Sequence, residues 1–174
     1  FLDAVNLGII VPPEYYWIEV KLDKEISFND FKNNIIISKK YENILNYIDI
    51  LLGKLVTQKG IFWSQTITNV KNWKDIFDEA KNSIKKYPNI SKFKFFITHS
   101  KTSNLENNKD NKVSELDKFM AYNHPAILLA VEQAKEGFDD PRVNIVGNLE
   151  PVKERSAHKS QQQTGRALRL FKNK

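Results

Sequence analysis

The stretch Ala126-Ile127-Leu128-Leu129-Ala130-Val131 is apolar at every position. An apolar run of this length, without alternating polar residues, is typical of a strand in a parallel sheet that helices cover on both faces. The stretch therefore predicts a buried strand of such a sheet. Working outward from it, aromatic and β-branched residues predict four more strands. These strands cover residues 15–22, 61–63, 94–98 and 143–146.

Segments between these strands carry apolar residues at the spacing of one helix face. The predicted helices cover residues 39–55, 68–86, 113–122 and 157–171, with one helical turn at 132–136. Residues 23–33 are predicted as a polar connection, and residues 34–37 as a short strand or the start of a helix. Strands that alternate with helices predict an α/β fold on a mostly parallel sheet. In such sheets the functional residues lie in loops at the carboxyl ends of the strands.

Length and composition limit the class of protein. A chain of 174 residues fits one domain with a sizeable core. A formal net charge of +6 favours a polyanionic partner, although abundant lysine alone would give the same value. The absence of cysteine excludes disulfides and thiolate sites, and three scattered histidines make a metal centre unexpected. No apolar run approaches the length of a membrane helix, so we expect a cytoplasmic protein.

Near the end of the sequence stands Gln162-Gln163-Thr164-Gly165-Arg166-Ala167-Leu168-Arg169. Two arginines three residues apart share one face of a helix, and each guanidinium presents a rigid fork of donors that fits phosphate oxygens. The pair can therefore hold a triphosphate. Taken alone, such a pair is more often a solvated helix face.

A second motif, Glu136-Gly137-Phe138-Asp139-Asp140-Pro141, follows the apolar strand. Gly137 permits a turn that is closed to other residues, and Pro141 fixes the exit toward the next strand. Asp139 would be held near the strand end, where a hydroxyl or an arginine can reach it. The alternative interpretation is a capped turn with two solvated aspartates.

In this order, the two motifs resemble motifs V and VI of superfamily 2 helicases. They are most similar to those of the motor subunits of type I and type III restriction enzymes and related DEAD/DEAH-like translocases. Residues 61–66 resemble motif IV of the same lobe. The resemblance covers roughly residues 61–169 and implies a RecA-like lobe, with residues 1–60 as the segment leading into it and its first strand and helix.

The resemblance implies roles in ATP hydrolysis for six residues. Arg169 would be the arginine finger on the γ-phosphate, and Arg166 a second contact to the phosphates or to the partner lobe. Gln162 and Gly165 would belong to the same nucleotide-binding motif. Gly137 and Asp139 would lie beside the nucleotide, with Asp139 near the ribose.

The resemblance also implies contacts to the backbone of a nucleic acid, with double-stranded DNA as the expected partner. The residues that would make them are Ser64, Thr66, Thr98, His99 and Ser100. An RNA helicase lobe, or a non-catalytic α/β interaction domain, remains an alternative. Trp63 and Trp73 are interpreted as core residues, and His99 and His158 as surface residues rather than catalytic groups.

Two features depart from the family pattern. Val131-Glu132 stands where many relatives have Thr-Asp, so a threonine contact to nucleic acid is missing. The sequence also contains neither a Gly-x-x-x-x-Gly-Lys-Ser/Thr loop nor an Asp-Glu-x-His/Asp box. We therefore expect ATP and Mg²⁺ to be bound mainly by a first lobe, and the chain to be inactive alone and part of a larger protein. The division expected within the chain is 1–60 and 61–174.

Overall fold

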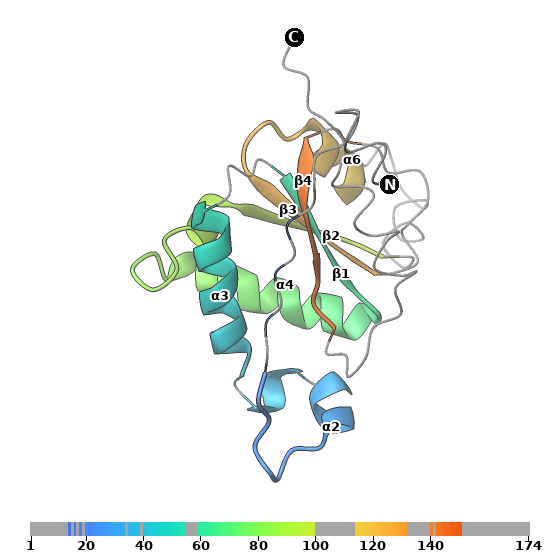
Figure 1. The fold of residues 1–174 in the computed structure, drawn as a ribbon. Coiled ribbons are helices and arrows are strands. Elements are labelled where there is room, and N and C mark those ends of the chain that lie inside the picture. The colour runs from blue at the N-terminus through green and yellow to red at the C-terminus, as the bar shows by residue number, and fades with distance from the viewer. Residues whose placement is uncertain are drawn as a thin grey trace, which may run out of the picture.

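The computed structural model describes residues 14, 16, 18, 20–33, 35–38, 40–54, 59–99, 114–131, 140 and 142–150 (Figure 1). Its centre is a four-stranded sheet in the order β2-β3-β1-β4, and every neighbouring pair is parallel. The strands are β1 (Lys59–Ser64), β2 (Lys94–Thr98), β3 (Ala126–Val131) and β4 (Val143–Asn148). The predicted α/β fold on a parallel sheet, of the RecA-like kind, is confirmed.

The strands agree closely with the prediction. The bounds of β2 and β3 are those predicted, whereas β1 and β4 extend beyond their apolar centres. The strand predicted at 15–22 does not appear in the part of that segment that the structure describes, because residues 16, 18 and 20–22 have no regular secondary structure.

Alternate side chains of β1 and β3 enter two separate cores, one on each face of the sheet. Phe62 and Leu129 belong to the larger core, and Trp63 and Leu128 to the smaller one. Every residue of both strands is buried. Burial on both faces is the physical reason that these strands lack the alternation of an exposed sheet.

Three of the helices were predicted: α3 (Tyr41–Lys54), α4 (Ile67–Asn82) and α6 (Glu115–Ala121). Side chains of α3 and α4 lie in the larger core, and Phe119 of α6 lies in the smaller one, so the helices cover opposite faces of the sheet (Figure 1). None of the helices in the described ranges is long and apolar enough to cross a bilayer.

Helix α4 ends at Asn82, four residues earlier than predicted. The N–H of Ser83 donates to the carbonyl of Ala80 and closes the last turn. The chain then turns so that Tyr87 and Ile90 enter the core, which leaves Ile84 65% exposed. Tertiary packing therefore overrides the helical spacing of the sequence at this point.

The polar connection predicted at 23–33 contains a helix instead, α2 (Phe28–Asn33). The hydroxyl of Ser27 accepts a hydrogen bond from the N–H of Asp30 (3.1 Å), and Phe31 is buried. A 3-10 helix, η1 (Ile35–Ser38), follows, close to residues 34–37, for which the sequence predicted either a short strand or the start of a helix. A second one, η2 (Ile90–Lys92), precedes β2.

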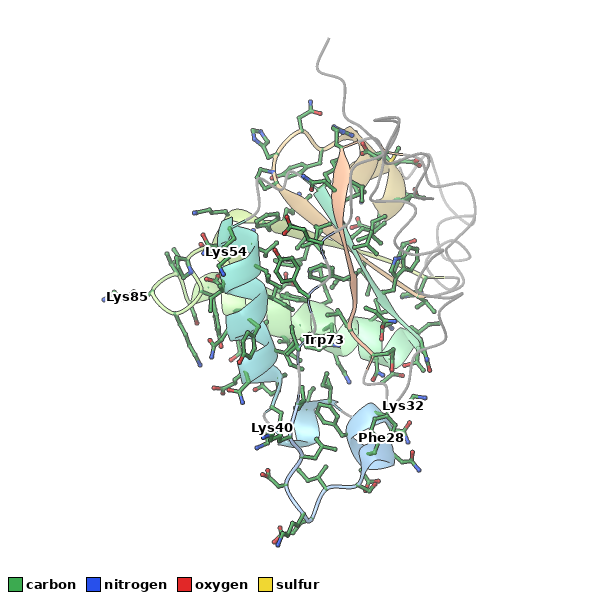
Figure 2. The ribbon with its side chains drawn as sticks, viewed as in Figure 1. Phe28, Lys32, Lys40, Lys54, Trp73 and Lys85 are labelled. Atoms are coloured by element: carbon green, nitrogen blue, oxygen red, sulfur yellow. The ribbon has the colours of Figure 1, made fainter. Side chains whose placement is uncertain are left out.

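Both tryptophans interpreted as core residues are buried. Trp73 lies on the inner face of α4, toward the sheet (Figure 2), with 1% of its surface exposed, and Trp63 is 2% exposed. The ring of Trp73 lies 5.5 Å from that of Phe77, which stacks on Phe95 at 4.5 Å. The same core includes Phe31. The segment before residue 60 therefore packs against the lobe, while the division at residue 60 stays a prediction.

Candidate functional site

The parallel sheet brings the carboxyl ends of its strands to one edge. Ser64 is opposite Val131, and Thr98 is opposite Ala130. Asn148 of β4 is opposite Trp63. The predicted nucleic-acid residues that the structure describes therefore lie along the same edge, as the strand pattern indicated.

Ser64 is the last residue of β1 and is 2% exposed. Its hydroxyl donates a hydrogen bond of 2.5 Å to Oε1 of Glu150. The hydroxyl is thus used within the protein in this structure. A direct contact from Ser64 to nucleic acid stays a prediction.

Thr66 is the N-cap of α4, and its hydroxyl accepts a hydrogen bond from the N–H of Asn69 (3.1 Å). A threonine in this position satisfies one of the free N–H groups of the first helical turn. Both Thr66 and its neighbour Gln65 are exposed. These two residues form the solvent-accessible part of the β1–α4 loop, which we define as Ser64, Gln65 and Thr66.

Thr98 and His99 follow the same edge at the end of β2. Thr98 is half-buried, and His99 is 6% exposed and engaged in contacts within the protein. The surface position expected for His99 is therefore wrong, because the residue after β2 still lies within the packed edge. Its predicted contact with nucleic acid stays untested.

Glu150 was not predicted as a site residue, yet it joins the β1–α4 loop to the end of β4. Its Oε1 accepts from Ser64 Oγ, from the N–H of Gln65 (2.7 Å) and from Nδ2 of Asn69 (3.2 Å). Glu150 is 6% exposed, and its Oε2 has no hydrogen-bond partner among the described residues. We call Glu150 and its three donors the Glu150 cluster.

At the opposite edge of the sheet, Lys59 and Asp140 form a buried ion pair with Nζ and Oδ2 2.9 Å apart. Lys59 also donates to the carbonyls of Phe119 (2.5 Å) and Met120 (3.0 Å) at the end of α6. Arg142 completes the group, because its Nε and Nη2 donate to the two oxygens of Asp140 at 2.8 and 2.7 Å. We call Lys59, Asp140 and Arg142 the Asp140 cluster.

The charges of this cluster shift its pKa values. Burial would raise the pKa of Asp140, but hydrogen bonds from Arg142 and Lys59 outweigh burial and lower this pKa from 3.8 to about 2. Burial lowers the pKa of Lys59, and the bond to Asp140 opposes that change. The hydrogen bond to Asp140 raises the pKa of Arg142. Asp140 is therefore a carboxylate at neutral pH.

Asp140 is the next residue after Asp139, so the cluster fixes the chain where the Glu136–Pro141 motif leads into β4. The backbone N–H of Arg142 donates to Oδ1 of Asp140 (3.0 Å), and that of Val143 donates to its carbonyl (3.1 Å). Lys59 is a charged residue at the start of a strand whose centre is apolar, whereas Glu150 follows the mixed strand β4 after one residue and has no comparable signal.

The residues predicted to bind nucleotide lie outside the described residues, as does Ser100. The nucleotide-binding set comprises Gly137, Asp139, Gln162, Gly165, Arg166 and Arg169. Their roles stay predictions. Across the ranges given above, no group of three His, Cys, Asp or Glu side chains is arranged to hold a metal ion.

Comparison with known proteins gives one family match. The model of the family described as the helicase conserved C-terminal domain matches residues 39–171. This range includes all of the predicted site residues. No curated protein matches the chain.

Proposed function

Because the chain belongs to the helicase conserved C-terminal domain family, we propose that it is the second RecA-like lobe of an ATP-dependent DNA helicase or translocase. In this proposal a first lobe binds ATP and Mg²⁺. This chain supplies arginines to the nucleotide and part of the groove for nucleic acid. The match over residues 39–171, which spans both the Gly137–Asp139 turn and the arginine pair, carries the proposal.

The nucleotide half of the proposal rests on the chemistry of the donors. ATP with Mg²⁺, when bound, supplies the phosphoanhydride bond whose hydrolysis drives the motor. Arg169 donates to the γ-phosphate, and Arg166 contacts the phosphates or the first lobe. Gln162, Gly165, Gly137 and Asp139 line the nucleotide. Because a guanidinium keeps its charge and binds with two donors, it suits the charge that develops on a phosphoryl group in transfer.

The nucleic-acid half is supported by the arrangement of the carboxyl edge. Thr66 and Gln65 are exposed there, and the half-buried Thr98 lies two strands away in the same sheet. Hydroxyl and backbone N–H groups are common contacts to phosphate oxygens and carry no sequence specificity. We propose Thr66, Thr98, His99 and Ser100 as contacts to the backbone. Ser64 belongs to the same loop, where its hydroxyl donates to Glu150, and its own contact with nucleic acid stays a prediction.

DNA is preferred to RNA because the arginine motif and the Glu-Gly-Phe-Asp turn resemble those of restriction-type motors. A net charge of +6 suits either polymer. The choice is tested by measuring ATP hydrolysis of the full-length protein with double-stranded DNA, single-stranded DNA and RNA of equal length. Stimulation by RNA alone would replace the DNA proposal with an RNA helicase lobe.

The arginine finger is tested in the full-length protein by Arg169→Ala. We expect DNA-stimulated ATP hydrolysis to fall by about a hundredfold or more, with ATP binding largely kept, because a finger acts on the transition state. Arg169→Lys keeps the charge without the fork and should recover only part of the rate.

Lys85→Ala is the matched surface control. Lys85 is exposed at the tip of the loop after α4 and points away from the domain (Figure 2), so the rate should not change. An unchanged rate for Arg169→Ala would contradict the motor function and favour the interaction-domain alternative.

A further inference from the structure

The Glu150 cluster is a junction of three chain segments at the carboxyl edge. Oε1 of Glu150 accepts from Ser64 and Gln65 of the β1–α4 loop and from Asn69 of α4. Asn69 also donates through Nδ2 to the carbonyl of Lys32 (3.0 Å), which belongs to α2. One buried carboxylate therefore holds the loop and the first turn of α4, and Asn69 bonds that turn to α2.

Glu150 is itself fixed to the end of β4. Its N–H donates to the side-chain oxygen of Asn148 (2.9 Å), and the N–H of Leu149 donates to the carbonyl of Trp63 (2.8 Å). The end of β4 thus lies beside the β1–α4 loop, and Glu150 is the side chain that bonds the two together.

Some buried oxygen atoms of the Glu150 cluster accept no hydrogen bond from the described residues. No described cation pairs with Glu150, and both its Oε2 and the Oδ1 of Asn69 are buried without a hydrogen-bond partner among the described residues. Unsatisfied buried acceptors cost stability and are uncommon in folded proteins. Such a cost is expected where a conformation is held for function rather than for stability.

We propose that Glu150 is a positioning residue that holds the β1–α4 loop in the conformation that contacts the nucleic-acid backbone. It would act through its bond to the N–H of Gln65 and through Ser64 and Asn69, which flank the exposed Thr66. Glu150 itself would not touch nucleic acid, because its carboxylate has the same sign of charge as the phosphates and its Oε1 already accepts three hydrogen bonds. This inference rests on the proposed motor function.

The test uses the full-length protein and measures the DNA concentration at half-maximal stimulation of ATP hydrolysis, together with the maximal stimulated rate. For Glu150→Ala we expect the half-stimulating concentration to rise about tenfold, because two hydrogen bonds to the loop and one to Asn69 of α4 are lost. The maximal rate at saturating DNA should fall by much less. Loss of the maximal rate with an unchanged half-stimulating concentration would overturn the proposal.

Glu150→Gln separates positioning from charge. Glutamine keeps one oxygen for the three donors, so the half-stimulating concentration should return to within about threefold of the wild type. Ser64→Ala removes one donor without disturbing the others and should raise that concentration by a few fold, roughly. If neither Ser64→Ala nor Glu150→Ala changed the half-stimulating DNA concentration, the proposal would be overturned, even if one of the two variants folded poorly.

Hydrogen exchange gives an independent measurement of the junction. In Glu150→Ala the amide of Gln65 should exchange faster, because its acceptor is removed. Faster exchange without a change in the DNA dependence would show that Glu150 orders the loop for another reason, and would overturn the inference. Failure of the motor function itself is distinguishable, since wild-type protein would then show no DNA stimulation.

Discussion

The two edges of the sheet each hold a buried carboxylate, but the carboxylates are bound in different ways. Asp140 at the amino edge is paired with Lys59 and Arg142, and its carboxylate accepts, among the described residues, from cationic side chains and a backbone N–H. Glu150 at the carboxyl edge accepts only from neutral donors and keeps one oxygen unpaired within the described part of the chain. The bonds at the amino edge stabilise the fold, whereas the carboxyl edge keeps two buried acceptors unpaired among the described residues.

The difference follows from what each edge has to join. At the amino edge, Lys59 donates to two carbonyls at the end of α6, so the ion pair fastens a helix to the first residue of β1. At the carboxyl edge, Glu150 bonds Ser64, Gln65 and Asn69, the residues on either side of Thr66, which we propose to contact nucleic acid.

The largest effect is expected from breaking the amino-edge ion pair. Asp140→Asn leaves Lys59, which is 1% exposed, buried without its counter-charge. Removing one partner of a buried pair typically costs about 3–5 kcal/mol of unfolding free energy. The measurement is urea unfolding followed by the fluorescence of the buried tryptophans.

The matched control is Lys86→Met, which removes the exposed ion pair with Glu42. Exposed pairs contribute little, so the unfolding midpoint should hardly move. If Asp140→Asn were as mild as this control, the amino edge would not be the stabilising region and the contrast between the edges would fail.

The pH dependence of stability should show the same ion pair. The pKa of Asp140 is about 2 in the folded protein and ordinarily 3.8, so folding favours its charged form. The resulting stabilisation, about 2 kcal/mol, is fully present above pH 3.8 and is lost as the pH falls through about 2. Wild-type protein should therefore lose more stability than Asp140→Asn between pH 5 and pH 2. Parallel curves for the two proteins would contradict the pKa of about 2.

The sequence predicted the centre of the fold well, because strands that are buried on both faces have to be apolar. The bounds of β2 and β3 were predicted correctly, and the helical spacing located α3, α4 and α6. The end of α4 and the presence of α2 were not predicted. Both depend on tertiary burial, of Ile90 in one case and Phe31 in the other, rather than on local spacing.

The two charged clusters could not be predicted from local pattern. Lys59 and Asp140 are 81 residues apart, and Ser64 and Glu150 are 86 apart. The order of the strands brings them together, and the sequence alone does not give that order. The arginine motif is the reverse case, since its spacing and its resemblance to helicases predict its role without any contact described by the structure.

A smaller effect is expected from the cap of α4. Thr66→Ala removes the hydroxyl that accepts from the N–H of Asn69 and should cost about 1 kcal/mol of unfolding free energy. Thr66→Ser keeps the acceptor and should restore most of that stability. Thermal unfolding of the two variants measures the difference, and equal losses would show that the methyl group of Thr66, rather than its cap, stabilises the helix start.

The smallest effect on stability is expected from Glu150→Gln. Glutamine retains an oxygen for Ser64, Gln65 and Asn69, removes a buried charge that no described cation neutralises, and adds an N–H₂ group to a region with an unpaired acceptor on Asn69. The change in unfolding free energy should therefore stay within about 1 kcal/mol, in contrast to the same chemical change at Asp140. Urea unfolding of the two variants side by side is the sharpest test of the contrast. A loss as large as that of Asp140→Asn would mean that Glu150 stabilises its edge as an anion, and that the two edges do the same structural work.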